Sequence, residues 1–455
     1  IPNFFKETAI NIIKNQIYEM NINDLKLQKR FIYNALNDFE MKKYNFNYIE
    51  EKLSSSNLNV SKQNLPVFIA NTIIQNNYLS SIDNTSGIWM GSELSMDDNN
   101  YRLSLLDFSL YSGVCGILIF LAEIYKKTKQ DYYLKVCKNS LNYIINNSDK
   151  LDVSSSMYNG IGSISYTCFY LYQITGDKYY KIYGKKYFED MVDKIQNSEF
   201  ESLAIDLLDG LSGNIIFCLE LYRIYKDKKY LDIARNFTVL LKEKLKSKIK
   251  SNNSELLTGL GHGVSGISLA LHKVSKYYPE FKNDVESVIE YEDKNFIERF
   301  LNWKDLRSNI STENKNINYW CHGRPGILLA RSIIYKNKSL PLSKEINYEN
   351  IVNLAYKQTK SMKRICLCHG IFGNLEMFKI ISKCFSNSYS INDISQFKEE
   401  LLSNNTTIPR IIKSLLNNNL VGLMTGVSGV GLSLLQDKKN IINPLLLKLP
   451  CPGEL

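Results

Sequence analysis

The chain has 455 residues and a formal net charge of +10, because 56 Lys and Arg outnumber 46 Asp and Glu. No apolar stretch reaches the length of a membrane span, and nine cysteines do not make a disulfide framework in a chain of this length without a recognisable secretion signal. Nothing in the sequence resembles a nucleic-acid-binding motif. These features argue against a membrane-spanning protein, a disulfide-stabilised domain and a nucleic-acid-binding protein.

A short glycine frame divides the chain into repeats. Gly-x-x-Gly or a close relative begins at seven positions spaced by 47 to 60 residues, namely Gly113, Gly160, Gly210, Gly263, Gly323, Gly370 and Gly426. The second frame is imperfect, because Ser163 stands where its second glycine would be. An apolar run follows each frame, as at 117–121, 215–219 and 327–330. Repeats of this length are typical of solenoids, propellers and closed arrays.

A second recurring segment lies between the frames and opens with aspartate, at Asp131, Asp177 and Asp227. Aspartate is a favourable helix N-cap, and the residues that follow place apolar side chains at helical spacing among lysines. Each repeat therefore predicts one buried helix, entered through the glycines, and one amphipathic outer helix.

Seven such pairs, with few strand patterns between them, predict an all-α fold, an α/α toroid of seven inner and seven outer helices. After Gly426 only one inner helix fits before Pro452, so we expect residues before about 100 to supply the outer helix that closes the ring. An open superhelix is the alternative architecture. We assign residues 1–64 to a helical lead-in that helps to close the ring, and residues 65–455 to the toroid domain.

The positive charge is spread through Lys-rich outer segments such as 242–248. Such segments are typical of a solvated helix face. The alternative is a weak attraction to an anionic membrane or to an acidic peptide. We expect a cytoplasmic protein that can associate peripherally with the inner face of the cell membrane.

Three of the four histidines stand directly before a frame glycine, at His262, His322 and His369. A cysteine precedes two of them, at Cys321 and Cys368. Cysteine and histidine are residues that bind zinc. In a ring, equivalent positions of adjacent repeats lie side by side at the same height, so the two sulfurs can converge. The pattern therefore predicts a metal site built from consecutive repeats.

The identity of the third ligand stays open at this point, because spacing alone does not separate His322 from His369. Cys366 is set aside, since only Cys368 shares with Cys321 the position two residues before a frame glycine. A zinc with two cysteines, one histidine and an open fourth position is a catalytic arrangement. The alternative is that these side chains simply pack in the core of the ring.

The motifs resemble those of the lanthionine synthetase C family of lanthipeptide cyclases, with Trp-Cys-His-Gly-x-Pro-Gly at 320–326, Cys-His-Gly at 368–370 and Gly-His-Gly at 261–263. The resemblance covers about residues 65–436. It implies an α/α toroid with zinc at one mouth of a central cavity, held by Cys321, Cys368 and His369. The length and the lack of a fused dehydratase domain are similar to the stand-alone bacterial type.

The resemblance also implies an activity and its partners. The substrate would be a dehydrated precursor peptide with a leader, and the enzyme would add its cysteine thiols to dehydroalanine or dehydrobutyrine. The products are the lanthionine and methyllanthionine rings of lantibiotics. Zinc would deprotonate the substrate thiol, which is mostly protonated at neutral pH. A dehydratase and an export transporter at the membrane are candidate partners.

Further site residues follow from the same family. His262 and Asp206 match its acid–base positions, so that His262 would move the thiol proton to the α-carbon while Asp206 orients it. The structural alternatives are a polar lining histidine and a helix N-cap beside Asp209. His322, next to Cys321, is a further catalytic candidate. We expect His272, outside the frames, to be a partly exposed helix residue.

Two positions depart from the family. Many bacterial members have tyrosine where this chain has His322, and members carry arginine four residues before the first zinc cysteine, where this chain has Ile317. Lys315 and Arg324 are the nearest cations that could replace that arginine, and we predict that Arg324 binds substrate. Trp320 is expected to form a wall of the cavity that holds the cysteine backbone or contacts the peptide.

Three other functions remain open. A relative could add glutathione or another small thiol to dehydroamino acids, and binding of a leader peptide would distinguish it. A non-catalytic zinc scaffold for a peptide-modifying complex would keep zinc without adding thiols. A carbohydrate-active α/α barrel would need paired carboxylates flanking its substrate, and Asp206 with Asp209 is a weaker signal than the Cys and His motifs.

Overall fold

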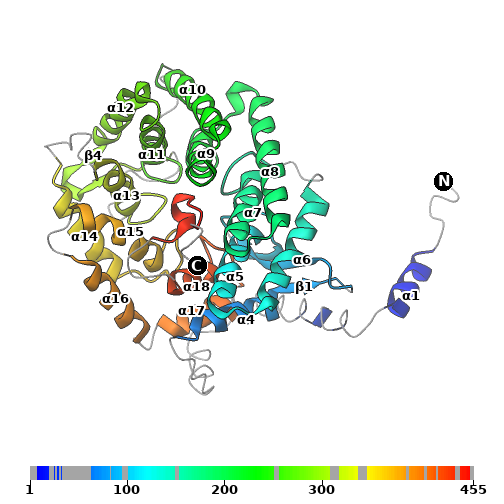
Figure 1. Cartoon of the computed structure of the whole chain (residues 1–455). Helices are drawn as coiled ribbons and strands as arrows, with labels where there is room; N and C mark the ends of the chain where they lie inside the picture. The colour runs from blue at the N-terminus through cyan, green and yellow to red at the C-terminus, as the bar shows by residue number, and fades with distance from the viewer. Residues whose placement is uncertain are drawn as a thin grey trace.

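A computed structural model describes residues 8–19, 63–81, 83–94, 101–148, 153–250, 256–307, 317–336, 346–385, 389–403, 407–416, 419–435 and 441–450, with four single residues between 25 and 32. Within these ranges the helices form two concentric layers around a central axis (Figure 1). The predicted all-α toroid is confirmed, with eight outer helices in the described ranges where seven were predicted.

The inner layer begins at the glycine frames. In the described part of the chain it comprises seven helices, α5 (Val114–Thr128), α7 (Ile161–Thr175), α9 (Leu211–Tyr225), α11 (Val264–Ser275), α13 (Arg324–Tyr335), α15 (Ile371–Phe385) and α18 (Val427–Leu435). Each starts at the residue after a frame glycine. The second glycine of a frame allows close packing, since a Cβ at Gly326 would overlap the carbonyl oxygen of Trp320.

The outer layer covers the inner one. It contains α4 (Leu65–Asn77), α6 (Asp131–Asn147), α8 (Lys178–Gln196), α10 (Lys228–Lys250), α12 (Lys282–Asp293), α14 (Tyr348–Lys360), α16 (Ile391–Ser403) and α17 (Thr407–Leu416). Asp177 caps α8 as expected, accepting from Tyr179 N at 2.9 Å, and Asp227 accepts from Lys229 N at 3.0 Å. Asp131 differs, because it is the first helical residue and the N-cap is Gln130.

Helix α18 closes the ring. It contacts α15 on one side and α5 on the other, so the architecture is a closed toroid and not an open superhelix. Helix α4 packs against α18 from outside, next to α17. Helix α1 (Ala9–Glu19) lies apart from the ring (Figure 1). Most of residues 1–62 are outside the described ranges, and the domain division at residue 64 stays a prediction.

Two small sheets were not predicted. Strands β1 (Tyr78–Ser80), β2 (Gly87–Leu94) and β3 (Tyr101–Leu105) pair antiparallel in the order β1-β2-β3, and β4 (Phe296–Ile297) pairs with β5 (Asn302–Trp303). The larger sheet is tied to the outer layer, because the buried Trp89 indole donates to Ser140 Oγ at 2.8 Å. Strands β1, β4 and β5 have only two or three residues each, too few for an alternating pattern to be read from the sequence. The short 3-10 helices are η2 (Phe200–Ser202), η3 (Pro279–Phe281), η4 (Glu298–Phe300) and η5 (Asn443–Leu446).

The segment 441–450 enters the middle of the ring (Figure 1). Tyr158 donates to Pro444 O at 2.7 Å, and Leu449 N donates to Glu220 Oε1 at 2.6 Å. Leu445 and Leu447 of this segment are fully buried. The segment therefore fills part of the space that the inner helices enclose. Among the described helices, none has the length and apolar character needed to cross a membrane.

Candidate metal centre

A ring of main-chain hydrogen bonds joins the loops that precede the inner helices. The bonded residues stand two positions before each frame glycine. The one exception is the donor Trp320, which stands three positions before Gly323. The bonds of 2.7 to 3.3 Å run from Tyr111 N to Tyr158 O, Tyr158 N to Leu208 O, Leu208 N to Gly261 O, Gly261 N to Cys321 O, Trp320 N to Cys368 O, Cys368 N to Met424 O and Met424 N to Tyr111 O. Equivalent positions therefore lie side by side, as the register predicted.

This ring brings Cys321 and Cys368 together with His369. The His369 Nε2 atom lies 3.3 Å from the Cys321 sulfur and 3.7 Å from the Cys368 sulfur. All three ligand atoms lie within 4.8 Å of one another. Both cysteines are buried and the histidine is half-buried. His322, which the spacing left open, is not a member of this group.

The backbone of the fifth frame differs from that of the frames before it. Gly323 has φ of +86°, whereas the corresponding caps Gly113, Gly160, Gly210 and Gly263 have φ between −96° and −129°. Tyr319 N donates to His322 O at 3.0 Å, and Gly323 forms an isolated bridge with Asn318. Only glycine adopts this positive φ readily. The backbone of the fifth frame thus differs from that of the earlier frames, and His322 is not in the group that contains His369.

The donor set fits zinc. A tetrahedral zinc bound to a thiolate and an imidazole places sulfur and nitrogen about 3.6 Å apart. The observed separations of 3.3 and 3.7 Å lie on either side of that value. Two cysteines and a histidine are three protein ligands, the number found in catalytic zinc sites that keep one position for water or substrate.

A second polar group stands around His262. Its Nδ1 atom lies 3.2 Å from Asp206 Oδ2 and 3.8 Å from Asp209 Oδ2. The hydrogen bond to Asp206 raises the pKa of His262, despite partial burial that lowers it. Asp206 also accepts from Asp209 N at 2.7 Å, so the same carboxylate shapes its loop and holds the imidazole.

A model of the lanthionine synthetase C-like proteins matches residues 104–447. The chain belongs to this family. It is 25% identical over 374 residues to the nisin biosynthesis protein NisC of Lactococcus lactis subsp. lactis, a match that covers 73% of this chain and 85% of NisC. The solved structure of nisin cyclase superposes with a TM-score of 0.56 at 21% identity, over 75% of this chain and 92% of that chain.

A longer relative also matches. The lacticin 481/lactococcin biosynthesis protein LcnDR2 of the same organism is 25% identical over 407 residues. The match covers 81% of this chain and 40% of LcnDR2, so the chain spans less than half of that protein. The family match and these relatives support a function like that of the lanthionine cyclases.

In this lanthionine synthetase C-like protein the members of the candidate metal group shift one another's pKa values. A hydrogen bond from Cys368 lowers the pKa of Cys321 well below its usual range, assisted by His369. Burial raises the pKa of Cys368. Burial alone would lower the pKa of His369, but the nearby thiols of Cys321 and Cys366 raise it to about 10. Cys366 is thus a neighbour of the site, although it lies outside the group of three.

Sequence reasoning missed Tyr111. Its hydroxyl donates to the Cys368 sulfur at 2.8 Å, and burial raises the pKa of Tyr111 well above its usual value. The hydroxyl therefore stays protonated and keeps its role as donor. Tyr111 stands two residues before Gly113, the frame position of the two cysteines, and this register is the signal that could have revealed it.

The predicted substrate residues are placed as follows. Trp320 is fully buried, with its ring 5.7 Å from that of Tyr158, and its amide belongs to the hydrogen-bond ring. Arg324 donates to Leu301 O at 2.7 Å, Phe300 O at 2.6 Å and Gln358 Oε1 at 2.8 Å. These bonds tie Arg324 to the η4–β5 segment and to α14, and its role toward substrate stays a prediction.

A different cation lies near the cysteines. Arg307 binds Asp305 at 2.5 Å, and this hydrogen bond, together with the nearby Cys321 sulfur, raises the pKa of the arginine. No motif marks Arg307, which lies in an irregular segment. Lys315, the other cation suggested by spacing, is outside the described residues.

Two histidines outside the metal group are buried. Burial lowers the pKa of His322, whose ring centre lies 6.1 Å from that of His262. His272, expected to be partly exposed, is only 6% exposed, because its face of α11 packs into the core. Burial lowers the pKa of His272 to about 4, so it stays neutral.

Proposed function

We propose that the protein is a zinc-dependent cyclase that closes thioether rings in a dehydrated precursor peptide during lantibiotic biosynthesis. The observation that carries the proposal is the convergence of Cys321, Cys368 and His369, whose ligand atoms lie within 4.8 Å of one another. Three soft or borderline ligands of this kind suit zinc, and the distances between them fit it.

In the proposed mechanism some residues bind the metal and others transfer protons. When bound by Cys321, Cys368 and His369, zinc supplies the charge that keeps a substrate thiol deprotonated. Tyr111 donates a hydrogen bond to the Cys368 sulfur and so fixes that ligand and spreads its charge. His262 takes the thiol proton, and Asp206 holds its imidazole in place.

Ring closure then balances without a further reactant. The substrate sulfur forms a bond to the β-carbon of dehydroalanine or dehydrobutyrine while the carbon–carbon double bond becomes single. The negative charge that develops toward the α-carbon and its carbonyl is discharged by the proton that His262 returns to the α-carbon. The product is lanthionine or methyllanthionine. His322 beside Cys321 is the second candidate for this proton transfer.

The peptide substrate is proposed from the relatives, whose names place them in the biosynthesis of nisin and of lacticin 481. A leader on the precursor, a dehydratase and an export transporter are the partners expected with such a substrate. We place the reaction in the cytoplasm, where dehydration would precede it.

Incubation of the zinc-loaded protein with a dehydrated, cysteine-containing peptide tests the proposal. Ring closure leaves the peptide mass unchanged, so free thiols are counted by alkylation and mass spectrometry. We expect the thiols to disappear with the wild type and to remain with Cys321→Ala, whereas Cys384→Ala serves as a matched control at an exposed cysteine outside the site. Zinc retention without thiol loss would favour a scaffold, whereas a peptide that keeps its own thiols and gains the mass of glutathione would favour a transferase.

The acid–base roles need their own variant. His262→Ala should keep zinc and peptide binding but slow ring closure by about 10² to 10⁴, the usual contribution of a general acid or base. Asp206→Asn should act in the same direction and combine non-additively with it. A wild-type rate in His262→Ala would transfer the role to His322.

A further inference from the structure

A polar pocket of about 330 Å³ opens beside the candidate metal group. Its lining includes His369 and Tyr319, whose rings meet edge to face at 5.2 Å, together with Gln358, Lys363 and Arg364. The volume lies at the small end of the range for ligand pockets. A peptide that brings its thiol to the metal group can therefore place a neighbouring side chain here.

The charge in this pocket has one sign. Its lining contains the cations Lys363 and Arg364 and no carboxylate. Both are exposed, and neither forms a salt bridge with any residue that the structure describes. An anionic group would gain two attractive partners without displacing an ion pair between described residues.

The loop geometry limits how far the anionic group lies from the reacting thiol. Lys363 and Arg364 belong to the loop between α14 and α15 that carries the metal cysteine, and Ile371 N closes this loop by donating to Arg364 O at 2.9 Å. Arg364 precedes Cys368 by four positions, a span of at most about 14 Å. An extended peptide covers the same distance in about four residues.

We propose that this pocket, the Lys363–Arg364 pocket, binds an acidic side chain of the substrate peptide within about four residues of the reacting cysteine. The proposal rests on the proposed function, because it takes a peptide cysteine as the group that reaches the metal. It adds a preference in the substrate, namely Asp or Glu near the cysteine whose ring is closed.

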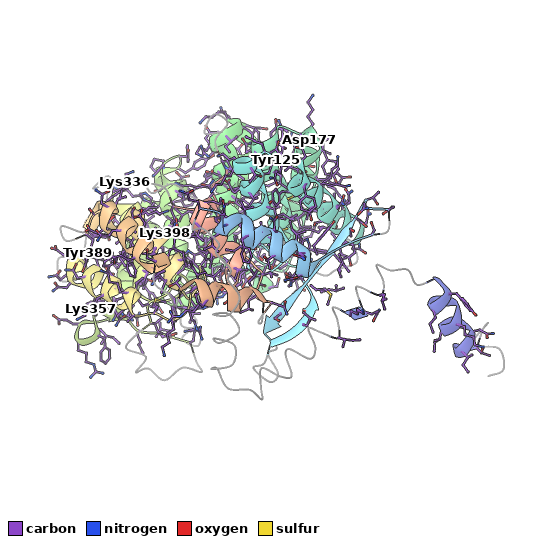
Figure 2. All side chains as sticks on the ribbon, turned by 90° about the horizontal axis from the view of Figure 1, so that it is seen from below. Tyr125, Asp177, Lys336, Lys357, Tyr389 and Lys398 are labelled. Atoms are coloured by element: carbon purple, nitrogen blue, oxygen red, sulfur yellow. The ribbon has the colours of Figure 1, made fainter. Side chains whose placement is uncertain are left out.

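A second pocket provides a matched control. It has a volume of about 500 Å³ and is lined by residues of α14 and by Tyr389, among them Lys357 and Lys360. Lys357 and Tyr389 lie on the flank of the ring away from Asp177 (Figure 2). None of the candidate metal ligands lines this pocket. Lys357 and Lys360 therefore serve as a control pair of cations, in a pocket that does not include the candidate metal ligands.

Two short cysteine-containing peptides that differ only in Asp or Asn two residues from the cysteine test the preference. Fluorescence anisotropy with the full-length, zinc-loaded protein should show about three- to tenfold tighter binding of the Asp peptide at low salt, falling as salt rises. Lys363→Gln with Arg364→Gln should bring the ratio close to one and leave the affinity for the Asn peptide unchanged. Lys357→Gln with Lys360→Gln should keep the wild-type ratio.

Equal affinity of the wild type for both peptides would overturn the proposal, as would an equal loss of preference in the two double variants. Binding requires no ring closure, so the two proposals fail separately. An Asp preference without cyclisation of a dehydrated peptide would contradict the proposed cyclase activity and support the proposed role of the pocket. Cyclisation with no Asp preference would support the proposed cyclase activity and contradict the proposed role of the pocket.

Discussion

The amide of Met424 donates a hydrogen bond of 2.7 Å to the carbonyl oxygen of Tyr111, and this bond joins the last repeat of the toroid to the first. It completes the ring of main-chain bonds that runs through the loops of Cys321 and Cys368. The same closure brings the Tyr111 side chain to the Cys368 sulfur, across 257 residues of sequence. The metal group thus depends on contacts between repeats as well as on its own motifs.

Loss of either cysteine should remove the metal and leave the fold. We expect about one zinc per chain in the wild type and far less than one in Cys321→Ala or Cys368→Ala, because each loses a ligand of a three-residue site. Helicity should stay close to that of the wild type, since the large apolar core does not include the ion. Metal analysis and circular dichroism measure both quantities, and stoichiometric zinc in Cys321→Ala would show that the site is wrong.

The two histidines that follow the cysteines should behave differently. His369→Ala should lose zinc, because Nε2 lies 3.3 and 3.7 Å from the two sulfurs. His322→Ala should keep zinc and show reduced ring closure. Metal analysis of the purified variants decides between them, and the reverse outcome would move the third ligand to the fifth repeat.

The His262–Asp206 pair should make stability depend on pH. Its hydrogen bond raises the folded-state pKa of His262 above the ordinary value of about 6.5. The stabilisation is therefore fully present below about pH 6.5 and is lost as the pH rises through the raised pKa. Asp206→Asn should lower that pKa in an NMR titration, and the difference in unfolding free energy from the wild type should shrink between pH 6 and pH 9.

Asp209→Asn is the matched control for that titration, since its carboxylate lies farther from His262, at 3.8 Å. It should lower the pKa of His262 by less than Asp206→Asn does. An unchanged His262 titration in Asp206→Asn would contradict the pairing.

Removal of the Tyr111 hydroxyl should weaken the metal site without emptying it. Hydrogen bonds to metal ligands typically contribute 10- to 100-fold in metal affinity, so we expect Tyr111→Phe to bind zinc about tenfold more weakly. With cobalt in place of zinc, the thiolate-to-metal absorption bands should shift, because the Cys368 sulfur loses its donor. Tyr319→Phe, at a tyrosine that packs against His369 only through its ring, should leave the bands in place.

A buried ion pair next to the loop that carries His262 should contribute strongly to the free energy of unfolding. Arg331 binds Glu292 at 3.0 Å with both side chains fully buried, and Glu292 also accepts from Gly259 N at 3.0 Å. Arg331→Met leaves that carboxylate without its cation and should cost about 3–5 kcal/mol in denaturant unfolding. Lys229→Met, which breaks an exposed pair with Glu189, should change the midpoint little. Equal midpoints for the two variants would contradict this account.

Local signals in the sequence determined the repeat and its register. Each inner helix starts after its frame glycine, and Asp177 and Asp227 cap the outer helices where they were expected. Such signals act within a few residues of the chain, so they are readable without the fold. Because the register is regular, it also predicted that Cys321 and Cys368 lie side by side.

The tertiary structure decided which side chains complete the site. His322 and His369 each stand between a cysteine and a glycine, yet only His369 joins the two cysteine sulfurs in one group among the described residues. Tyr111 reaches Cys368 because the seventh repeat closes on the first. This contact depends on the geometry of every repeat in the ring. Sequence patterns specify where a residue stands within its repeat, whereas the direction of a side chain across the ring depends on the backbone of every repeat between the two partners.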